Sequence, residues 1–276
     1  MKNKFLKMQG IGNDFVVFDS THSEINFSPE TIQKISDRKL GVGCDQVLFI
    51  DRPKTENTDF HYRIFNADGS EAEQCGNGAR CIALFIQHQN LSKKTKLNIG
   101  TKNGTITTEI ISKNEISVNM GLPNFEPSKI PFITNEVSET YKVKIKKDSF
   151  HYSVVSIGNP HAVLIVNDLS KIEINDLGEK IGNLDNFPEG VNVSFMEIKT
   201  PSLVSLRVYE RGVGQTMACG SGACASAVIG ISKGLLNNQV QVCQPGGNLM
   251  VSWKGMNTSI LMTGPAKVVY EGIFEI

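Results

Sequence analysis

Apolar residues alternate with polar ones, or run together in short stretches, along most of the chain, and both patterns predict β-strands. Two of the stretches follow each other closely enough to form a hairpin. In chain order, the predicted strands cover residues 15–18, 47–50, 61–65, the hairpin 105–111 with 115–119, then 141–146, 163–166, 193–195 and 203–209. Most of the predicted elements are therefore strands.

Three segments predict helices. Ser28 is a good N-cap and Pro29 suits the first turn that follows it. The other two helices, at residues 80–87 and 224–231, each come directly after a Cys-Gly-x-Gly-Ala segment. Residues 224–231 leave almost no polar face, and a helix that is apolar nearly all round must be buried. We therefore expect each half of the chain to be a strongly curved sheet around one central helix.

The chain contains an internal duplication. Four segments of the first half recur in the same order in the second half, at nearly one spacing. Residues 63–66 and 75–79 recur 144 residues later, at 207–210 and 219–223, and residues 12–13 and 46–47 recur 146 residues later, at 158–159 and 192–193. A chance similarity would not keep both the order and the spacing, so we interpret the chain as two homologous halves.

Gly and Pro residues between positions 120 and 131 mark the boundary between the halves. We predict an α+β fold of two homologous domains related by a pseudo-two-fold axis, each a curved, mostly antiparallel sheet or barrel around a central buried helix. The N-terminal domain would comprise residues 1–120 plus 265–276 and carry Cys75. The C-terminal domain would comprise residues 121–264 and carry Cys219, with the active site in the cleft between the two domains.

The charge balance excludes several classes of partner. Lys and Arg together number 28, as do Asp and Glu, so the formal net charge is zero. A neutral chain without a basic block is not expected to bind nucleic acid or an anionic membrane. No apolar run approaches the roughly 20 residues that span a bilayer, and the opening stretch has no signal-peptide pattern. We expect a cytoplasmic protein.

The six cysteines of such a protein should be reduced thiols. No pair has the Cys-x-x-Cys spacing and no two His residues have ligand spacing, so neither a thioredoxin-type motif nor a zinc or other metal site is expected. We expect four of the six to be buried as small apolar side chains: Cys44, Cys81, Cys224 and Cys243.

Cys75 and Cys219 are the candidate chemical groups. Each precedes a glycine-rich helix start, where unpaired N–H groups and the helix dipole favour an anion such as a carboxylate. The same positive end lowers the pKa of a thiol from about 8.5. If both starts converge on one carbon, one sulfur can remove a proton while the other delivers one to the opposite face. The alternative is that these residues only pack two buried helices, which the duplicated context makes less favourable.

No cofactor motif accompanies the two cysteines. Residues 10–12 and 41–43 each begin like a dinucleotide fingerprint, but the third glycine is missing in both. The chain has no P-loop, and no lysine stands in a motif typical of a pyridoxal Schiff base. We therefore expect a cofactor-independent reaction.

The motifs around the two cysteines resemble those of diaminopimelate epimerase. Residues 66–71 leading into 75–81 are similar to the first signature of that family, and residues 210–214 leading into 218–222 are similar to the second. Residues 10–15, 41–46 and 158–161 also match, and the resemblance extends from about Met8 to the C-terminus. Residues 141–147 and 182–186 fit the family pattern less well.

The resemblance implies interconversion of LL- and meso-2,6-diaminopimelate, a step toward lysine and peptidoglycan precursors. Cys75 and Cys219 match the acid/base pair of the family, and His161 and Glu210 match positions that tune the two sulfurs. Backbone N–H groups of Gly76, Asn77, Gly220 and Ser221 would hold the reacting carboxylate. Seven side chains match residues that line the substrate site of the family: Asn13, Gln46, Asn66, Asn159, Asn192, Glu210 and Arg211. Glu210 thus matches both a substrate-binding position and a position that tunes a sulfur.

The chemistry of these residue types fits a substrate with a second amino-acid end. Arg211 can form a two-pronged pair with the distal carboxylate, and Glu210 can accept hydrogen bonds from the distal ammonium. The resemblance also implies a homodimer with Tyr270 as a candidate interface residue. Alternatively, Tyr270 packs inside its own domain, and His161 is a structural histidine.

Other readings of the same motifs stay open. Proline and hydroxyproline racemases also use paired cysteines, although their small substrates need fewer polar contacts. The relatives that make phenazine precursors lack the cysteine pair. A thiol redox or metal-binding protein would predict bound metal or a disulfide required for activity, and a binding module would predict ligand binding without solvent exchange.

Overall fold

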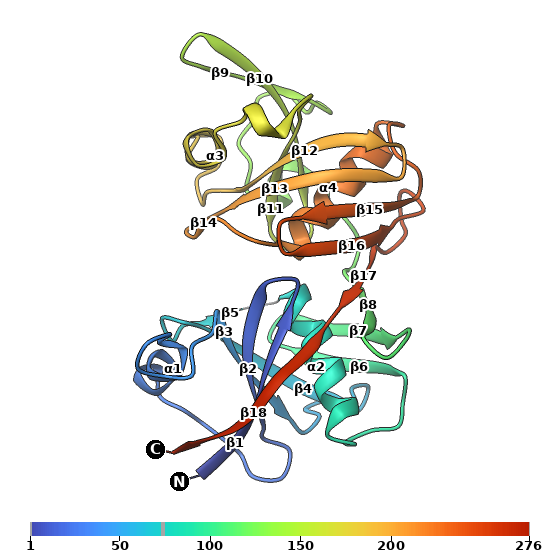
Figure 1. The fold of residues 1–276 in the computed structure, drawn as a ribbon. Helices are drawn as coiled ribbons and strands as arrows, with labels where there is room; N and C mark the ends of the chain where they lie inside the picture. The colour runs from blue at the N-terminus through green and yellow to red at the C-terminus, as the bar shows by residue number, and fades with distance from the viewer. Residues whose placement is uncertain (1, 73–74, 276) are drawn as a thin grey trace. The chain divides into compact units, whose positions relative to one another are not determined.

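The structure is a computed structural model that describes residues 2–72 and 75–275. The chain divides into two compact units (Figure 1). Unit 1 comprises Met1–Asn119 and Thr263–Ile276, and unit 2 comprises Met120–Met262. Within the described ranges the chain forms four α-helices and eighteen strands, and none of these helices is long and apolar enough to cross a bilayer.

Unit 1 is built on a mixed sheet of eight strands in a continuous order. The order is β18 (Lys267–Glu275), β1 (Lys2–Gly10), β2 (Asn13–Asp19), β3 (Gln46–Asp51), β4 (Phe60–Asn66), β6 (Lys96–Thr101), β7 (Gly104–Ile110) and β8 (Glu115–Asn119). The short β5 (Glu71–Ala72) pairs with β4 as well. Among the neighbouring strands in this order, the pairs β2–β3 and β4–β6 are parallel and the others are antiparallel, so the described sheet is mostly antiparallel.

A buried helix, α2 (Gly76–His88), lies against the concave side of this sheet (Figure 1). It contacts β1, β2 and β3 as well as the distant strands β7 and β8, which requires the sheet to curve around it. A second helix, α1 (Pro29–Ser36), packs its apolar face on a separate cluster that includes Phe18 and Phe49. Ser28 Oγ accepts a hydrogen bond from Thr31 N at 3.3 Å, which confirms the predicted N-cap.

Unit 2 repeats this architecture. Its strands follow the order β9 (Tyr141–Ile145), β10 (Asp148–Ser156), β11 (Pro160–Ile165), β12 (Asn192–Thr200), β13 (Leu203–Glu210), β15 (Gln239–Gln244) and β16 (Gly247–Ser252). The short β14 (Gly214–Gln215) pairs with β13, and β17 (Leu261–Pro265) lies where the chain passes from unit 2 back to unit 1. The parallel pairs, β11–β12 and β13–β15, are the counterparts of those in unit 1.

The central helix of unit 2 is α4 (Gly220–Ser232), which contacts β10, β11, β12, β13, β15 and β16. The strand register confirms the duplication: Phe15 faces Gln46 between β2 and β3, and His161 faces Asn192 between β11 and β12. Both central helices begin at Gly76 and Gly220, four residues before the predicted segments. The predicted α+β fold, with a curved sheet around one buried helix in each unit, is confirmed.

One helix of unit 2 is absent from the sequence-based prediction. Helix α3 (Ile174–Gly182) occupies the position in unit 2 that α1 has in unit 1, between β11 and β12. Its N-cap residue, Glu173, makes no side-chain capping hydrogen bond. The helix is instead stabilised by burial of Leu177 and Ile181, and tertiary packing of this kind leaves no local start signal.

The contact of α3 with β13 gives a prediction on stability. A Cβ atom added at Gly178 would lie 2.5 Å from Cβ and 2.6 Å from Cγ of Tyr209, whereas the nearest atom to one added at Gly182 would be Val191 O at 3.4 Å. We expect Gly178→Ala to lower the free energy of unfolding by about 1–3 kcal/mol, because the ring base cannot move aside without repacking. Gly182→Ala, on the same helix, should be neutral or stabilising. Urea unfolding of both variants checks the difference in sign.

Candidate active site

Cys75 is the N-cap residue of α2. Its backbone is extended, with φ −138° and ψ 115°, and its Sγ accepts a hydrogen bond from Gly78 N at 3.4 Å. The N–H groups of Gly76 and Asn77 belong to the first turn, where no carbonyl of the helix itself reaches them. The sulfur and the positive end of the helix therefore stand together, as the sequence pattern predicts.

Side-chain amides from three strands of unit 1 lie near the start of α2. Asn13 begins β2, Gln46 begins β3 and Asn66 ends β4, so all three stand at the same end of the sheet. The Oδ1 atom of Asn13 is 3.8 Å from the Cys75 sulfur. Gln46 Nε2 donates to Asn66 Oδ1 at 3.0 Å. We refer to Asn13, Gln46, Asn66, Cys75, Gly76 and Asn77 as the Cys75 cluster.

Asn77 is held by a buried arginine. The guanidinium of Arg80, which has no exposed surface, donates from Nη2 to Asn77 Oδ1 at 3.0 Å and from Nε to Pro265 O at 3.2 Å. The Asn77 side chain is thus directed along its own helix. Its backbone N–H remains at the helix start, where the family resemblance places a carboxylate contact.

Cys219 is the N-cap residue of α4, with φ −124° and ψ 115°. Its Sγ accepts from Gly222 N at 3.3 Å and lies 3.5 Å from Ser221 Oγ. Its own N–H donates to Gln244 Oε1 at 2.8 Å. The thiol environment at the start of α4 therefore repeats that at the start of α2, with one hydroxyl added.

A chain of polar side chains leads from this sulfur into the core of unit 2. Asn159 Nδ2 donates to Ser221 Oγ at 3.3 Å, and Asn159 Oδ1 lies 3.0 Å from Nε2 of His161. His161 is fully buried in β11. The structure thus connects His161 to Cys219 through Asn159 and Ser221.

Glu210 ends β13 of the same unit, and Arg211 follows it directly. Asn192 Oδ1 accepts from Arg211 N at 3.0 Å, and Asn192 Nδ2 donates to Pro160 O at 3.1 Å. The guanidinium of Arg211 donates to Glu189 O at 2.8 Å. Glu210 Oε1 accepts from Thr216 Oγ1 at 2.6 Å. We refer to Asn159, His161, Asn192, Glu210, Arg211, Cys219, Gly220 and Ser221 as the Cys219 cluster.

Burial sets the protonation state of His161. Desolvation, with a smaller contribution from the charge of Arg211, lowers the pKa of His161 to about 3. The ring is therefore neutral near pH 7. Its Nδ1 atom has no hydrogen-bond partner among the described residues.

This depressed pKa predicts an acid sensitivity of the fold. Because the unfolded pKa is about 6.5 and the folded pKa is lower, the unfolded state binds the extra proton first, and stability falls as the pH falls below about 6.5. His161→Phe places at this position the residue type of its unit 1 counterpart, Phe15. The free energy of unfolding of this variant should fall by roughly 2 kcal/mol less than that of the wild type between pH 7.5 and 5. Urea unfolding of both proteins at the two pH values measures that double difference, and equal losses would contradict it.

Two residues that were not predicted from the sequence interact with the two cysteines. Gln244, at the end of β15, binds the N–H of Cys219 and is 7% exposed. Tyr62 of β4 is fully buried, and burial together with the charge of a Cys75 thiolate raises its pKa. Neither residue lies in a motif, so only the fold brings it to its cysteine.

The six cysteines are all free thiols. Cys44, Cys81 and Cys224 are buried, as predicted, and burial raises the pKa of Cys81 to about 12. The prediction for Cys243 is wrong, because this residue is partly exposed on β15, where Gln241 Nε2 lies 3.8 Å from its sulfur. Within residues 2–72 and 75–275, no three His, Cys, Asp or Glu side chains form a group that could hold a metal ion.

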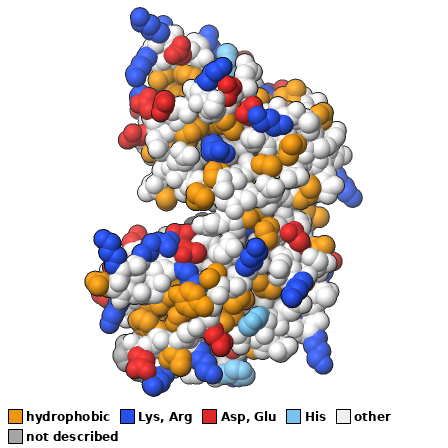
Figure 2. Space-filling model, viewed as in Figure 1, with side chains coloured by type: hydrophobic (Ala, Val, Ile, Leu, Met, Phe, Trp, Pro, Cys, Tyr) orange, Lys and Arg blue, Asp and Glu red, His pale blue; other side chains and the backbone are white. Residues whose placement is uncertain are grey.

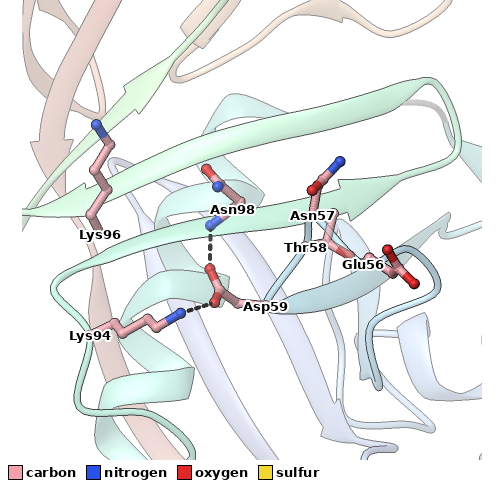
Figure 3. A pocket seen from close by; sticks show the side chains of 7 residues that line it. All are labelled: Glu56, Asn57, Thr58, Asp59, Lys94, Lys96 and Asn98. Carbon is pink, nitrogen blue, oxygen red and sulfur yellow. Dashed lines mark hydrogen bonds and ion pairs between the residues drawn. The ribbon is translucent and has the colours of Figure 1, made fainter.

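A separate polar pocket of about 310 Å³ opens on unit 1 (Figure 3). Its main charged contact is between Lys94 Nζ and Asp59 Oδ1 at 2.6 Å, and Asp59 Oδ2 also accepts from Asn98 N at 2.8 Å. A second pocket, of about 370 Å³ and lined by Arg207 and Gln215 among others, opens on unit 2. None of the predicted site residues lines either pocket.

Tyr270 lies on β18, where its ring contacts Phe5 edge-on with 6.1 Å between centroids. The residue is nevertheless 45% exposed, beside Val269 and Ile273, which are exposed by more than half. Figure 2 shows apolar side chains gathered on the face of unit 1. Tyr270 therefore both packs on its own sheet and contributes to an exposed apolar surface.

Comparison of the chain with known proteins identifies one matching family. A family model described as diaminopimelate epimerase matches residues 5–126 and 153–269, and so includes both clusters. Similar solved structures include a phenazine biosynthesis protein of the PhzF family from Bacillus anthracis, at 17% identity and TM-score 0.69 with both chains covered completely. A hydroxyproline epimerase from Agrobacterium vitis has 12% identity and TM-score 0.73, and a probable proline racemase from Agrobacterium radiobacter has 13% and 0.72. Each of these two alignments covers 99% of this chain and 92% of the other. At these identities the three structures establish a common fold.

Proposed function

Because this chain belongs to the diaminopimelate epimerase family, we propose that it interconverts LL- and meso-2,6-diaminopimelate with Cys75 and Cys219 as the acid/base pair and without a cofactor. The observation that carries the proposal is the repeated placement of a thiol as the N-cap of a buried, glycine-rich helix start, once in each unit. The reaction would supply meso-diaminopimelate for lysine and peptidoglycan precursor biosynthesis.

The proposed chemistry is a two-base proton transfer. One cysteine, as thiolate, removes the α-proton and becomes a thiol, while the electron pair of the C–H bond delocalises into the α-carboxylate. The other cysteine, as thiol, delivers its proton to the opposite face and becomes a thiolate. N–H groups in the first turns of α2 and α4, at Gly76, Asn77, Gly220 and Ser221, stabilise the charge that develops on the carboxylate.

The polar side chains of the two clusters favour a substrate with two amino-acid ends. We propose that Arg211 binds the distal carboxylate and Glu210 the distal ammonium, with the amides of Asn13, Gln46, Asn66, Asn159 and Asn192 completing the contacts. In addition, His161 and Glu210 would tune the two sulfurs. A small cyclic amino acid has no second amino-acid end for Arg211 and Glu210 to bind, which disfavours a proline substrate.

Solvent deuterium incorporation tests the proposal. Reduced protein incubated with meso-diaminopimelate in deuterated water, without added cofactor, should place deuterium at one α-carbon and form the LL isomer. Proline and trans-4-hydroxyproline, assayed in parallel, should remain unlabelled. Labelling of proline alone would reassign the substrate, and the absence of any label in a folded protein would reject the epimerase function.

We also propose that the protein is a cytoplasmic homodimer with Tyr270 in its interface. The exposed apolar residues of β18 support this placement, because monomeric proteins rarely expose such surfaces without a function. Tyr270→Arg should shift the sedimentation coefficient from dimer to monomer. Ile111→Arg, which replaces a 57% exposed apolar residue elsewhere on unit 1, is the matched control. A wild-type monomer at micromolar concentration would contradict the proposal.

A further inference from the structure

The two sulfurs have one hydrogen bond in common and differ in the next. Each accepts a backbone N–H from its own helix, Gly78 N at 3.4 Å for Cys75 and Gly222 N at 3.3 Å for Cys219. This contact stabilises a thiolate equally in both units. A difference in protonation state can therefore arise from the side chains that face the sulfurs.

In unit 1, the Asn13 side chain presents an acceptor to the sulfur. Asn13 Nδ2 donates to Asp45 Oδ2 at 3.0 Å, and the same carboxylate accepts from Arg38 Nη2 at 2.7 Å. A carboxylate paired in this way offers only acceptors, so it can bind only the NH₂ side of the Asn13 amide. The carbonyl oxygen of Asn13 is thereby turned to Cys75, 3.8 Å away. An acceptor at this place favours the thiol, because the S–H can donate to it.

In unit 2, a hydroxyl stands between the amide and the sulfur. Ser221 Oγ is 3.5 Å from Cys219 Sγ and accepts from Asn159 Nδ2 at 3.3 Å. With one lone pair of Oγ used by Asn159, the hydroxyl hydrogen can point at the sulfur. A donor at this place favours the thiolate.

His161 sets the direction of this chain. Its Nε2 is 3.0 Å from Asn159, and a proton on Nε2 binds the carbonyl oxygen of that amide and turns its NH₂ group to Ser221. The reverse direction would need the proton on Nδ1, which is buried without a partner among the described residues. A buried N–H donor without an acceptor is costly. The Nε2–H tautomer, and with it the direction toward a thiolate, is therefore favoured.

The residues that create this difference are those at which the duplication is broken. The shift of 146 residues that relates Asn13 to Asn159 relates Phe15 to His161 and Asp45 to Val191. Val191 is fully buried and apolar, so the position equivalent to Asp45 offers Asn159 no carboxylate. Likewise, the motif that contains Asn77 in unit 1 contains Ser221 in unit 2. Two similar environments have thus acquired hydrogen-bond partners of opposite polarity.

We propose that the substrate-free protein holds Cys219 as the thiolate and Cys75 as the thiol, with Asp45 and Ser221 as the positioning residues that set this difference. The inference deepens the proposed function and rests on it for its catalytic meaning. The resting protein would then be prepared to remove the α-proton with Cys219 and to deliver one from Cys75. It would act in this state on only one of the two isomers.

The charged and titratable neighbours are compatible with this assignment. Tyr62 and Cys81 face Cys75, and both have raised pKa values, chiefly because they are buried, so both are neutral near pH 7. Beyond Asn13, burial raises the pKa of Asp14, but hydrogen bonds from Arg38 and Lys7 outweigh this and hold that pKa well below its usual range.

On the Cys219 side, His161 is neutral near pH 7, because burial and, to a smaller extent, the charge of Arg211 lower its pKa. Arg211 is bound to Glu189 O, and the carboxylate of Glu210 is bound to Thr216. Arg211 and Glu210 are adjacent and of opposite charge, so as a pair they add no net charge that would oppose a thiolate at Cys219.

Site-resolved alkylation of the reduced, substrate-free protein tests the inference. Iodoacetamide labelling is followed from pH 5 to 10 by peptide mass spectrometry, and the midpoint of each profile is compared. Midpoints are used instead of rates because Cys219 is only 5% exposed and reacts more slowly for that reason. We expect the Cys219 midpoint to lie at least about one pH unit below that of Cys75.

Variants separate the two positioning residues. Ser221→Ala should raise the midpoint of Cys219 and leave that of Cys75 unchanged, whereas Ser221→Thr should restore it. Asp45→Asn frees the Asn13 amide to turn its NH₂ to the sulfur, so the midpoint of Cys75 should fall. Circular dichroism checks that each variant is folded.

Two results would overturn the inference: a Cys75 midpoint equal to or below that of Cys219, or a Ser221→Ala profile identical to wild type. The wild-type comparison decides the question even if a variant fails to fold. Because alkylation needs no substrate, a failure here is distinguishable from a failure of the proposed epimerase activity.

Discussion

Cys75→Ala and Cys219→Ala are each expected to reduce the inversion of diaminopimelate by about 10³-fold or more, the range found when a positioned acid or base is removed. Inversion needs a proton removed on one face and another delivered on the opposite face. Without one of the sulfurs, a proton can be moved on only one face of the α-carbon. The remaining thiol can then at most exchange the α-proton with retention of configuration. Chiral chromatography of the two isomers measures inversion, and deuterium incorporation measures exchange.

The matched control is Cys243→Ser, which replaces a partly exposed thiol on β15 that lies outside both clusters. This variant should keep the activity of the wild type. If either alanine variant inverted the substrate at more than a tenth of the wild-type rate, the two-base role would be wrong. Loss of activity in Cys243→Ser would indicate that thiol substitution acts through stability instead.

Arg80→Met is expected to lower the free energy of unfolding by about 3 kcal/mol. The guanidinium of Arg80 is fully buried at the start of α2, where it binds Asn77 Oδ1 and Pro265 O. Methionine fills part of the volume but leaves both oxygens without their charged donor. Pro265 ends β17, where the chain re-enters unit 1. Loss of the hydrogen bond to Pro265 O therefore also weakens the attachment of this segment to unit 1.

Urea unfolding followed by circular dichroism measures this effect as a lower midpoint with an unchanged slope. Arg52→Met is the matched control, since Arg52 is exposed and donates to the single backbone oxygen of Thr21. We expect the control to change the free energy of unfolding by less than about 0.5 kcal/mol. Equal effects of the two substitutions would show that the buried hydrogen bonds contribute little.

The duplication explains why sequence reasoning reached both clusters. Local signals mark each central helix, because a Cys-Gly-x-Gly-Ala segment precedes it and the apolar stretch that follows predicts burial. The strands β2, β3 and β4 were also predicted, whereas Asn13, Gln46 and Asn66 at their ends were named through the family resemblance. A residue that stands beside its partner through strand pairing, such as Gln46 beside Asn66, follows from register alone.

Residues held by tertiary packing were not predicted. Helix α3 has no capping signal and depends on burial of one face against β12 and β13. Gln244 reaches Cys219 from the end of a distant strand. The alternation of β15 places Cys243 on the side that remains partly exposed, so its residue type alone was a poor guide to its burial.

By itself, the sequence determined the two-unit α+β fold, the repeated thiol at each helix start and the family to which the chain belongs. These features depend on local residue patterns and on an internal repeat, and both can be identified from the order of residues alone. The tertiary structure alone decided which hydrogen-bond partner faces each sulfur. Asp45 orients Asn13 although 32 residues separate the two along the chain. His161 is close to Asn159 in sequence, but the burial that fixes its tautomer, and with it the direction of the Asn159 amide, depends on how unit 2 packs around it.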